Sequence, residues 1–283
     1  MRARFDAFVA IDWSGAKGRR HKGIAIAEAR GDAAPRLVRP GHVWSRTEVL
    51  AWLLKRAAVE PTLFGFDCSF APPLIERGEY LPGEPGVPAT AKEFWKYVEG
   101  RCDDEDLGAA SFLEDAHRRH FYFGIADGVK ADFVRFRQCD QALNLTGGRK
   151  TASAYDAIGA AQVAKASFSG MRLLQRIDGN VAIWPMDPLT DRASAVVEIY
   201  TRIYLRQAGM SGRKLRSRAE LNQALSGLGS PPARLRFEPN DHQTDALVTA
   251  AGMRSLADDP RAFAPGGLTP DIARSEGWTF GVI

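Results

Sequence analysis

The stretch "TLFGFDCSF", residues 62–70, decides the fold that the sequence predicts. Its Leu-Phe-Gly-Phe run has no polar interruption, which is typical of a strand covered on both faces, as in a parallel sheet. It follows "SRTEVLAWLLKRAA", residues 45–58, an amphipathic helix pattern with Ser45 or Thr47 as its N-cap. We therefore predict that residues 62–70 form a central strand that runs parallel to the first strand of the chain.

Three predicted strands precede that helix. Residues 5–12, 22–30 and 35–45 carry short apolar runs, and turn residues between 31 and 35 separate the second strand from the third. Strands this close in sequence pair as an antiparallel meander. The ribonuclease H-like (RNase H-like) fold begins with three antiparallel strands, a helix and a parallel fourth strand. A doubly wound sheet instead alternates strand and helix from its first element. The predicted fold class is therefore α/β, with an RNase H-like mixed sheet flanked by helices.

A long insertion follows the fourth strand. Residues 71–90 are rich in Pro and Gly and indicate an ordered loop, and helical patterns follow it. We predict one domain over residues 1–283, with a largely helical insertion at about 71–180. The other predicted elements are helices at 90–102, 111–123, 132–145, 153–177, 217–229 and 240–259 and strands at 180–185, 193–201 and 276–283.

The composition is that of a globular protein with an apolar core. Of 283 residues, 45% are hydrophobic and 25% are charged, and the formal net charge is +4. That charge is compatible with a polyanionic partner but does not require one. Cys68, Cys102 and Cys139 include no C-x-x-C pair, which argues against a disulfide framework and a structural zinc site. Because the sequence has no apolar leader and no membrane-length run, we expect a cytoplasmic location and no membrane partner.

Acidic residues stand where predicted strands end. Asp12 closes the first strand, Asp67 the fourth and Glu198 a later one, and Asp245 lies near the start of the last long helix. If the first and fourth strands are neighbours, these carboxylates converge at one edge of the sheet. Clustered carboxylates repel one another unless a divalent cation lies between them, and oxygen ligands suit Mg²⁺ or Mn²⁺. We therefore expect a Mg²⁺ or Mn²⁺ site at this edge.

The last long helix adds Asp241 and His242 to this set. Asp241 and Asp245 share one face of the helix, and His242 lies on an adjoining face. Small and apolar residues on the other side are expected to dock the helix on the sheet, so that Asp245 points to the acidic edge. Asp241 fits a metal ligand and a helix N-cap equally well. A single acid after a strand is usually a turn former, so it is the conjunction of four that favours a functional site.

A family resemblance rests on the motifs "VAIDWSGA" (9–16), "LFGFDCSFAPP" (63–73), "GAAQVAKASFSGMRLL" (159–174), "AVVEIYTR" (195–202), "DHQTDALVTAAGM" (241–253) and "EGWTFGV" (276–282). In this order they resemble an uncharacterised family of predicted nucleases with an RNase H-like fold. The resemblance implies that the four acids are the functional ones. The spacing of His242 and Asp245 is similar to that in the last metal-binding helix of the RuvC-like resolvases. Two departures are Thr201, where family members carry proline, and the insertion, which has little motif coverage.

The reaction that this resemblance implies is metal-assisted hydrolysis of a phosphodiester in DNA or RNA. Two ions held by the four acids would activate a water and stabilise the leaving oxygen, without a side-chain nucleophile. Asp12, on the central strand, would bridge the ions. His242 would order the water or assist protonation of the leaving group, which requires a pKa near neutrality.

Two basic clusters, the first at residues 17–22 and the second at residues 212–218, are candidate contacts for nucleic-acid phosphates. Such contacts give affinity without sequence choice and weaken with salt. Each basic cluster also fits a solvated face of the protein. The basic and aromatic stretch 117–123 fits either base stacking or packing in the core. The acidic loop 100–108 is expected to lie away from a substrate. The candidate substrate-binding residues are Ser14, Lys17, Arg19, Arg20, Arg213, Lys214 and Arg216.

Two other functions remain open on the sequence. An actin-like or sugar-kinase-type ATP-binding phosphotransferase has a similarly opening sheet, but it requires two glycine-rich phosphate loops, and Gly147-Gly148 is the only later candidate. A non-catalytic nucleic-acid-binding or protein-binding module that has kept the fold is the second alternative. Clustered acids without an ion would destabilise such a module.

Overall fold

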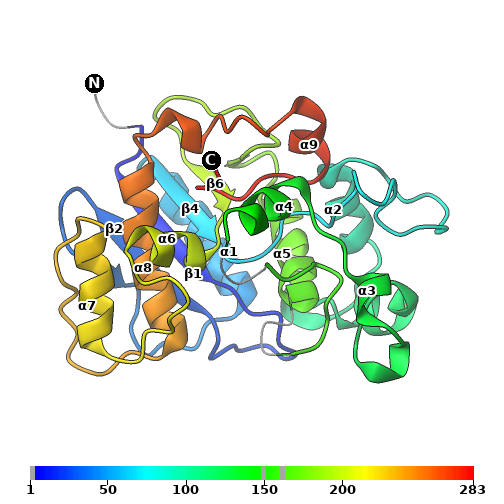
Figure 1. Cartoon of the computed structure of the whole chain (residues 1–283), viewed down its shortest axis with the longest axis horizontal. Helices are drawn as coiled ribbons and strands as arrows, with labels where there is room; N and C mark the ends of the chain where they lie inside the picture. The colour runs from blue at the N-terminus through cyan, green and yellow to red at the C-terminus, as the bar shows by residue number, and fades with distance from the viewer. Residues whose placement is uncertain (1–3, 148–150, 160–162) are drawn as a thin grey trace.

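Six strands form one mixed sheet in the computed structural model, which describes residues 4–147, 151–159 and 163–283 (Figure 1). The strands are β1 (Ala7–Asp12), β2 (Ala25–Arg30), β3 (Arg36–Leu37), β4 (Thr62–Phe66), β5 (Ala182–Ile183) and β6 (Ala195–Glu198). Their order across the sheet is β3-β2-β1-β4-β6-β5. The first three strands are antiparallel, and β4, β6 and β5 continue the sheet in parallel with β1. The prediction of a mixed α/β sheet flanked by helices is confirmed.

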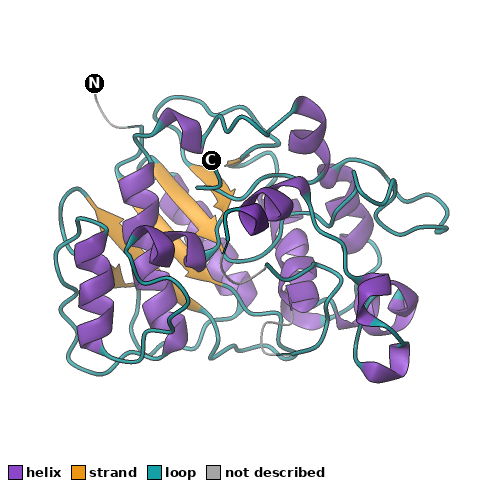
Figure 2. Cartoon of the chain, in the orientation of Figure 1, coloured by secondary structure: helices purple, strands orange, loops and turns teal. Residues whose placement is uncertain are grey.

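Helices cover both faces of this sheet (Figure 2). The longer helices are α1 (Arg46–Ala57), α2 (Ala91–Glu99), α5 (Val163–Ile177), α7 (Arg218–Gly227) and α8 (Asp241–Leu256). The shorter ones are α3 (Lys130–Phe133), α4 (Gln138–Leu145), α6 (Thr201–Gln207) and α9 (Pro270–Ser275). Helix α1 begins where the sequence predicts, because Ser45 caps it and Glu48 completes a capping box.

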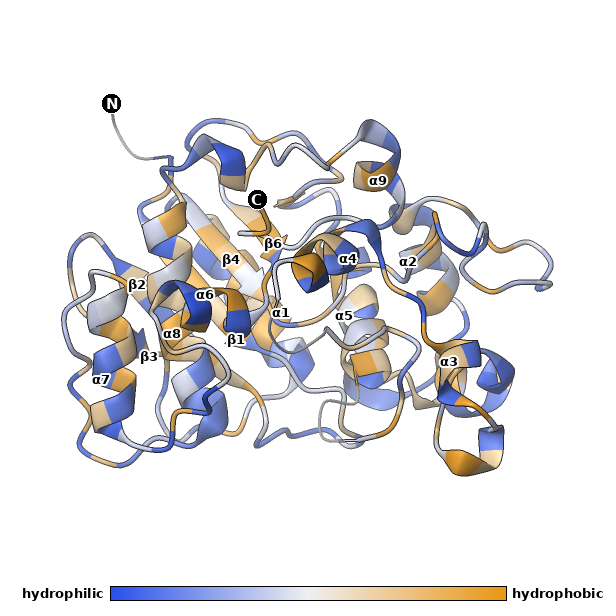
Figure 3. Cartoon of the chain, viewed as in Figure 1, coloured by the Kyte–Doolittle hydropathy of each residue, from blue (hydrophilic) through white to orange (hydrophobic). Residues whose placement is uncertain are grey.

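Strand β1 divides two apolar cores. Val9 and Ile11 lie in the core that includes α1, α2 and α5, whereas Phe8 and Ala10 lie in the core that includes α6, α7 and α8. Successive side chains of a strand point to opposite faces, so a strand covered on both faces is apolar at every position. Figure 3 shows the apolar character of the central strands and the mixed character of the surface helix α7.

The insertion differs most from the prediction. Helices α2 and α5 form and pack on each other, but the helix predicted over 153–177 is too long: residues 153–159 are not helical, and α5 is described from Val163 onward. The helix predicted over 111–123 is wrong as a single element: a π-helical turn (Ser111–Ala116) is followed by a 3₁₀ turn (Arg118–His120). The break falls at His117, whose φ and ψ of −126° and 23° are not helical.

Two predicted strands are shortened or absent. The strand predicted over 35–45 is shortened to β3, because the chain turns away at Arg39 (φ 50°) and Gly41 (φ 81°); beyond this turn it makes an isolated antiparallel bridge between Trp44 and His21. The segment 276–283 forms no strand and makes a single parallel bridge between Glu198 and Thr279.

The three cysteines, all in the described part of the chain, are free thiols. Among the helices that the structure describes, none has both the length and the apolar character needed to cross a bilayer. The fold is held by its two cores and by polar networks between elements. One of these networks surrounds Glu28.

Glu28 is a buried carboxylate on β2 that ties neighbouring elements to the sheet. Its two oxygens contact the guanidinium groups of Arg30 (2.8 Å), Arg36 (3.0 Å) and Arg56 (2.6 Å). Arg36 belongs to β3 and Arg56 to α1, so this single acid links three elements. Burial alone would raise the pKa of Glu28, but hydrogen bonds from the three arginines outweigh it and lower the pKa to about 2.

We predict that this network makes the fold sensitive to acid. The pKa of Glu28 is lower in the folded protein than in the unfolded chain, so its stabilisation is present above about pH 4.5 and is lost as the pH falls toward 2. The loss amounts to about 3 kcal/mol in the free energy of unfolding. Urea titrations between pH 2 and 6 should show a shallower pH dependence for Glu28→Gln than for the wild type. Exposed Glu93→Gln is the control; equal slopes for the wild type and Glu28→Gln would contradict the prediction.

Candidate active site

The carboxyl ends of β1, β4 and β6 meet at one edge of the sheet and bring three predicted acids side by side. Asp12 ends β1, and Asp67 directly follows β4, its parallel neighbour; the Asp67 N–H donates to the carbonyl of Ile11 (3.1 Å). Glu198 ends β6 and pairs in register with Phe66 of β4. Because adjacent strands lie about 4.8 Å apart, the backbones at Asp12, Asp67 and Glu198 are immediate neighbours.

Helix α8 brings two more predicted residues to this edge. Its buried face packs on β1 and β2, which places the first turns of the helix, with His242 and Asp245, over the end of β1. Asn240 caps the helix and forms a capping box with Gln243. Of the two roles predicted for Asp241, that of N-cap is therefore wrong, because the preceding residue fills it.

His242 and Asp12 form a hydrogen-bonded pair. The Nδ1 atom of His242 lies 2.5 Å from Oδ2 of Asp12. The side chain of His242 is 49% exposed, whereas that of Asp12 is 11% exposed. The hydrogen bond to Asp12 raises the pKa of His242, and the charges of Asp12, Asp245 and Asp241 act in the same direction. His242 therefore keeps its proton to a higher pH than a free histidine does.

The acids at this edge repel one another. Burial raises the pKa of Asp12, although the hydrogen bond from His242 offsets part of the rise. Burial, followed by the charges of Asp12, Asp245 and Glu198, raises the pKa of Asp67 well above its usual range. Burial and the charge of Asp12 raise the pKa of Asp245 to about 7. This edge therefore concentrates negative charge, which His242, Arg202 and Lys214 partly offset.

Two of these acids have lone pairs to offer. Among the described residues, no donor hydrogen-bonds to the carboxylate of Asp67 or Asp245. Nor does any group of three or more His, Cys, Asp or Glu side chains in the described ranges have an arrangement that holds a metal ion. Ion binding at this edge therefore requires the carboxylates of Asp12, Asp67 and Asp245 to turn toward a common point. Oxygen donors of this kind match the preference of Mg²⁺ and Mn²⁺.

Glu198 lies at the same edge but in a different environment. Arg137, at the start of α4, holds it with two contacts of 2.6 Å, one to each oxygen. Both side chains are almost fully buried. Leaving one charge of such a pair without its partner costs about 3–5 kcal/mol. The sequence gives no sign of this pair, because its members are 61 residues apart and Arg137 lies in the insertion.

The loop after β1 is rigid. Trp13 is buried against Phe66, and its Nε1–H donates to Ser169 on α5 (2.9 Å). The fully buried guanidinium of Arg46 donates to the carbonyls of Ser14 (2.9 Å) and Ala16 (2.6 Å). Sequence analysis does not identify Arg46, since a helical arginine is usually exposed.

This loop also approaches its neighbours closely. A Cβ on Gly15 would lie 2.1 Å from the backbone of Lys165 on α5, so only glycine fits. A Cβ on Gly23 would lie 3.3 Å from Oγ of Ser14 and 3.5 Å from Cε1 of His242. Ser14 therefore lies beside the histidine of the candidate site.

The first basic cluster is paired with acids. Lys17 contacts Glu114 (2.6 Å) and Arg19 contacts Glu105, both in the insertion, and Arg20 contacts Glu48. The predicted acidic loop 100–108 supplies Glu105, and the π-helical turn after it supplies Glu114, so both acids face these cations. A cavity of about 410 Å³ lies between them, lined by loop residues 15–18, by Lys165 and by residues 103–115.

The second basic cluster lies beside the candidate site. Lys214 pairs with Asp241 (2.8 Å), and its charge also acts on Asp245. Arg213 and Arg216 are exposed, and their guanidinium groups form no ion pair with a described residue. Of the two clusters, this one has cations available for phosphates.

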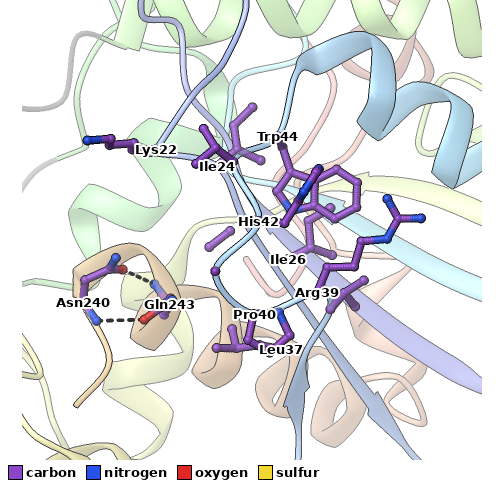
Figure 4. Close-up of a pocket in the computed structure, with 14 residues that line it drawn as sticks. Lys22, Ile24, Ile26, Leu37, Arg39, Pro40, His42, Trp44, Asn240 and Gln243 are labelled. Atoms are coloured by element: carbon purple, nitrogen blue, oxygen red, sulfur yellow. Dashed lines mark hydrogen bonds between the residues drawn. The ribbon is translucent and has the colours of Figure 1, made fainter. Parts of the chain in front are cut away.

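A cavity of about 220 Å³ opens next to the site, between the start of β2 and the first turn of α8 (Figure 4). It forms where the chain leaves the sheet edge after β3 and returns to it at Trp44. The Trp44 carbonyl accepts a hydrogen bond from the His21 N–H (2.8 Å). Figure 4 shows His42 beside Trp44 on one side, and Asn240 and Gln243 on the other. The cavity has a mixed polar and apolar lining without a described Asp or Glu, which distinguishes it from the acidic edge.

The stretch 117–123 belongs mainly to the core. Phe121 is buried against Tyr155 and Phe168, and His117 and His120 are also buried. Of the two roles that the sequence allows, packing is therefore confirmed for Phe121.

Comparison with models of known protein families, with curated proteins and with solved structures finds no match for this chain. A functional interpretation of this edge therefore rests on the side chains present there. These are the carboxylates of Asp12, Asp67 and Asp245, the hydrogen-bonded His242 and the neighbouring cations.

We predict that Asp245→Asn stabilises the protein at alkaline pH in the presence of EDTA. The pKa of Asp245 is raised to about 7 in the folded protein, so the wild type loses stability as the pH rises from about 4 through 7. The variant escapes this loss and should gain roughly 2–4 kcal/mol at pH 8 and nothing below pH 4. Denaturant unfolding at both pH values measures the difference.

Asp241→Asn, on the same helical turn, is the matched control. Its hydrogen bond with Lys214 lowers the pKa of Asp241, so its substitution should bring no gain at pH 8. Equal stability of Asp245→Asn and the wild type at pH 8 would contradict the prediction.

Proposed function

We propose that this chain is a Mg²⁺- or Mn²⁺-dependent nuclease with an RNase H-like fold. The observation that carries the proposal is the meeting of Asp12, Asp67 and Asp245 at one strand edge, where burial raises the pKa of each and the charges of neighbouring acids add to the rise. Such a cluster is destabilising in a protein that does not bind a cation. The sheet order, antiparallel from β3 to β1 and parallel from β1 to β6, supports the fold.

The residues at this edge fit a divalent ion. Asp12, Asp67 and Asp245 offer carboxylate oxygens, and the last two have no competing donor among the described residues. A bound Mg²⁺ or Mn²⁺ supplies Lewis-acid stabilisation of the negative charge that develops on the phosphate oxygens.

The chain's own residues account for the proton. In hydrolysis the attacking water bonds to phosphorus and releases a proton to solvent, the ester P–O bond breaks, and the leaving oxygen takes up a proton. His242 has the exposure and the raised pKa of a proton donor. Its Nδ1 is engaged by Asp12, so Nε2 is the atom that gives the proton. Solvent then restores that proton.

The nucleic acid would lie over the second basic cluster. Arg213, Lys214 and Arg216 precede α7 and flank the first turn of α8, and two of the three are free to bind phosphates. The first cluster is a weaker candidate because Lys17, Arg19 and Arg20 already have acidic partners. Ser14 lies near His242, because a Cβ on Gly23 would contact both side chains.

We predict that Asp12→Asn abolishes cleavage. The substitution keeps the size of the side chain and removes its charge, so activity should fall by at least about 100-fold. Single-stranded, duplex and branched DNA and RNA, incubated with Mg²⁺ or Mn²⁺, provide the substrates. Asp132→Asn, an exposed residue of α3 away from the sheet edge (Figure 1), is the matched control. Undiminished cleavage by Asp12→Asn would remove this residue from the mechanism.

The same wild-type protein distinguishes a nuclease from the two alternative functions. An ATP-binding phosphotransferase would hydrolyse ATP or transfer its phosphoryl group. In the candidate phosphate loop Gly147-Gly148, Gly148 lies outside the described residues. A binding module without an ion would show no thermal shift with Mn²⁺. A nuclease site at 100 times its Kd for Mn²⁺ gains about 2.7 kcal/mol.

We predict that Arg213→Ala/Arg216→Ala weakens nucleic-acid binding about tenfold at low salt. Two lost phosphate contacts should also lower the slope of log K against log salt by about 2. Fluorescence anisotropy with a labelled oligonucleotide in EDTA, which prevents cleavage, measures both quantities.

Arg19→Ala/Arg20→Ala is the control of equal charge. Both of its arginines are paired with acids in the folded protein, so its effect should be smaller. A larger effect from the control would move the nucleic acid to the first cluster.

A further inference from the structure

We propose that Arg137 is a permanent counter-cation of Glu198, so that this edge binds one divalent ion rather than two. The inference rests on the proposed metal-dependent function and differs from the two-ion site that the sequence suggests. It also gives the insertion a role, because Arg137 lies within it.

The carboxylate of Glu198 has no acceptor site left. Its Oε2 accepts hydrogen bonds from Arg137 Nη1 (2.6 Å) and the Phe70 N–H (2.8 Å). Its Oε1 accepts from Arg137 Nη2 (2.6 Å) and the Thr279 hydroxyl (2.7 Å). An ionised carboxylate offers about four lone-pair sites. All of them are used, in contrast to Asp67 and Asp245.

Arg137 is fixed in this position. It is buried, and its Nε and Nη2 donate to the two oxygens of Asp140 (3.0 and 3.2 Å). The next residue, Gln138, donates its N–H to Glu276 Oε2 (2.8 Å), and Glu276 is itself fully buried. A guanidinium keeps its charge at every pH at which proteins fold. Arg137 can therefore neither move away from Glu198 nor lose its proton.

A second divalent ion at Glu198 would be repelled. It would have to approach within a few ångströms of the guanidinium in a buried setting, where screening by water is weak. A forked guanidinium-carboxylate pair also has favourable geometry that an ion would have to replace. Glu198 is thus a positioning residue: through the Phe70 N–H it holds the segment that follows Asp67.

Counting bound Mn²⁺ tests this inference. The full chain is stripped with EDTA, desalted and titrated with Mn²⁺ at pH 7.5, and free Mn²⁺ is measured by electron paramagnetic resonance. We expect one Mn²⁺ per chain. Two Mn²⁺ per chain of comparable affinity would overturn the inference.

A double variant tests the assignment of Glu198. Arg137→Met/Glu198→Met replaces the buried pair with apolar side chains; Asp140 then loses its contacts with the guanidinium, so the fold of the variant has to be checked. Its Kd for Mn²⁺ should stay within about threefold of the wild-type value, whereas Asp67→Asn should weaken binding about 100-fold or more. A loss in the double variant as large as that in Asp67→Asn would make Glu198 a ligand. Circular dichroism checks the fold, and the wild-type count stands on its own if the double variant does not fold.

Cleavage assays on the same wild-type samples separate this inference from the proposed function. One Mn²⁺ per chain without cleavage of any nucleic acid overturns the function and leaves the single-ion count standing. Two Mn²⁺ per chain together with cleavage overturns the single-ion count and supports the proposed function. No bound Mn²⁺ overturns both.

Discussion

Parallel pairing of β1 with β4 forces two carboxylates to be neighbours at the end of a buried sheet. Asp12 and Asp67 follow paired positions, so no rearrangement of loops can separate their backbones by more than about one strand spacing. Helix α8 then adds Asp245 from above. Burial raises the pKa of all three acids, and the charges of neighbouring acids add to the rise. In the proposed function a divalent cation relieves this repulsion.

The rest of the site is built around this charge. His242 supplies a hydrogen bond to Asp12, and Arg137 neutralises Glu198 before any ion binds. Arg46 fixes the loop after β1 by its backbone carbonyls. The insertion therefore does more than cover the sheet: it provides the cation for Glu198 and the acids that neutralise the first basic cluster.

Sequence patterns predict the parts of this arrangement that depend on local order. Apolar runs locate the strands, and a charge at the end of each run places Asp12, Asp67 and Glu198 at a common edge. Pairing between distant segments has no such signal. The contact of Arg137 with Glu198 depends on how α4 meets the sheet, and the pairing of Lys17 with Glu114 spans 97 residues. Composition shows that these charges exist but not which of them neutralise one another.

Anomalous diffraction from crystals soaked in Mn²⁺ tests the central claim most directly, since it locates the ion without reference to any substrate. The account predicts one strong peak bounded by the carboxylates of Asp12, Asp67 and Asp245, with Glu198 still held by Arg137. An empty strand edge at saturating Mn²⁺, or a peak in direct contact with Glu198, would contradict it.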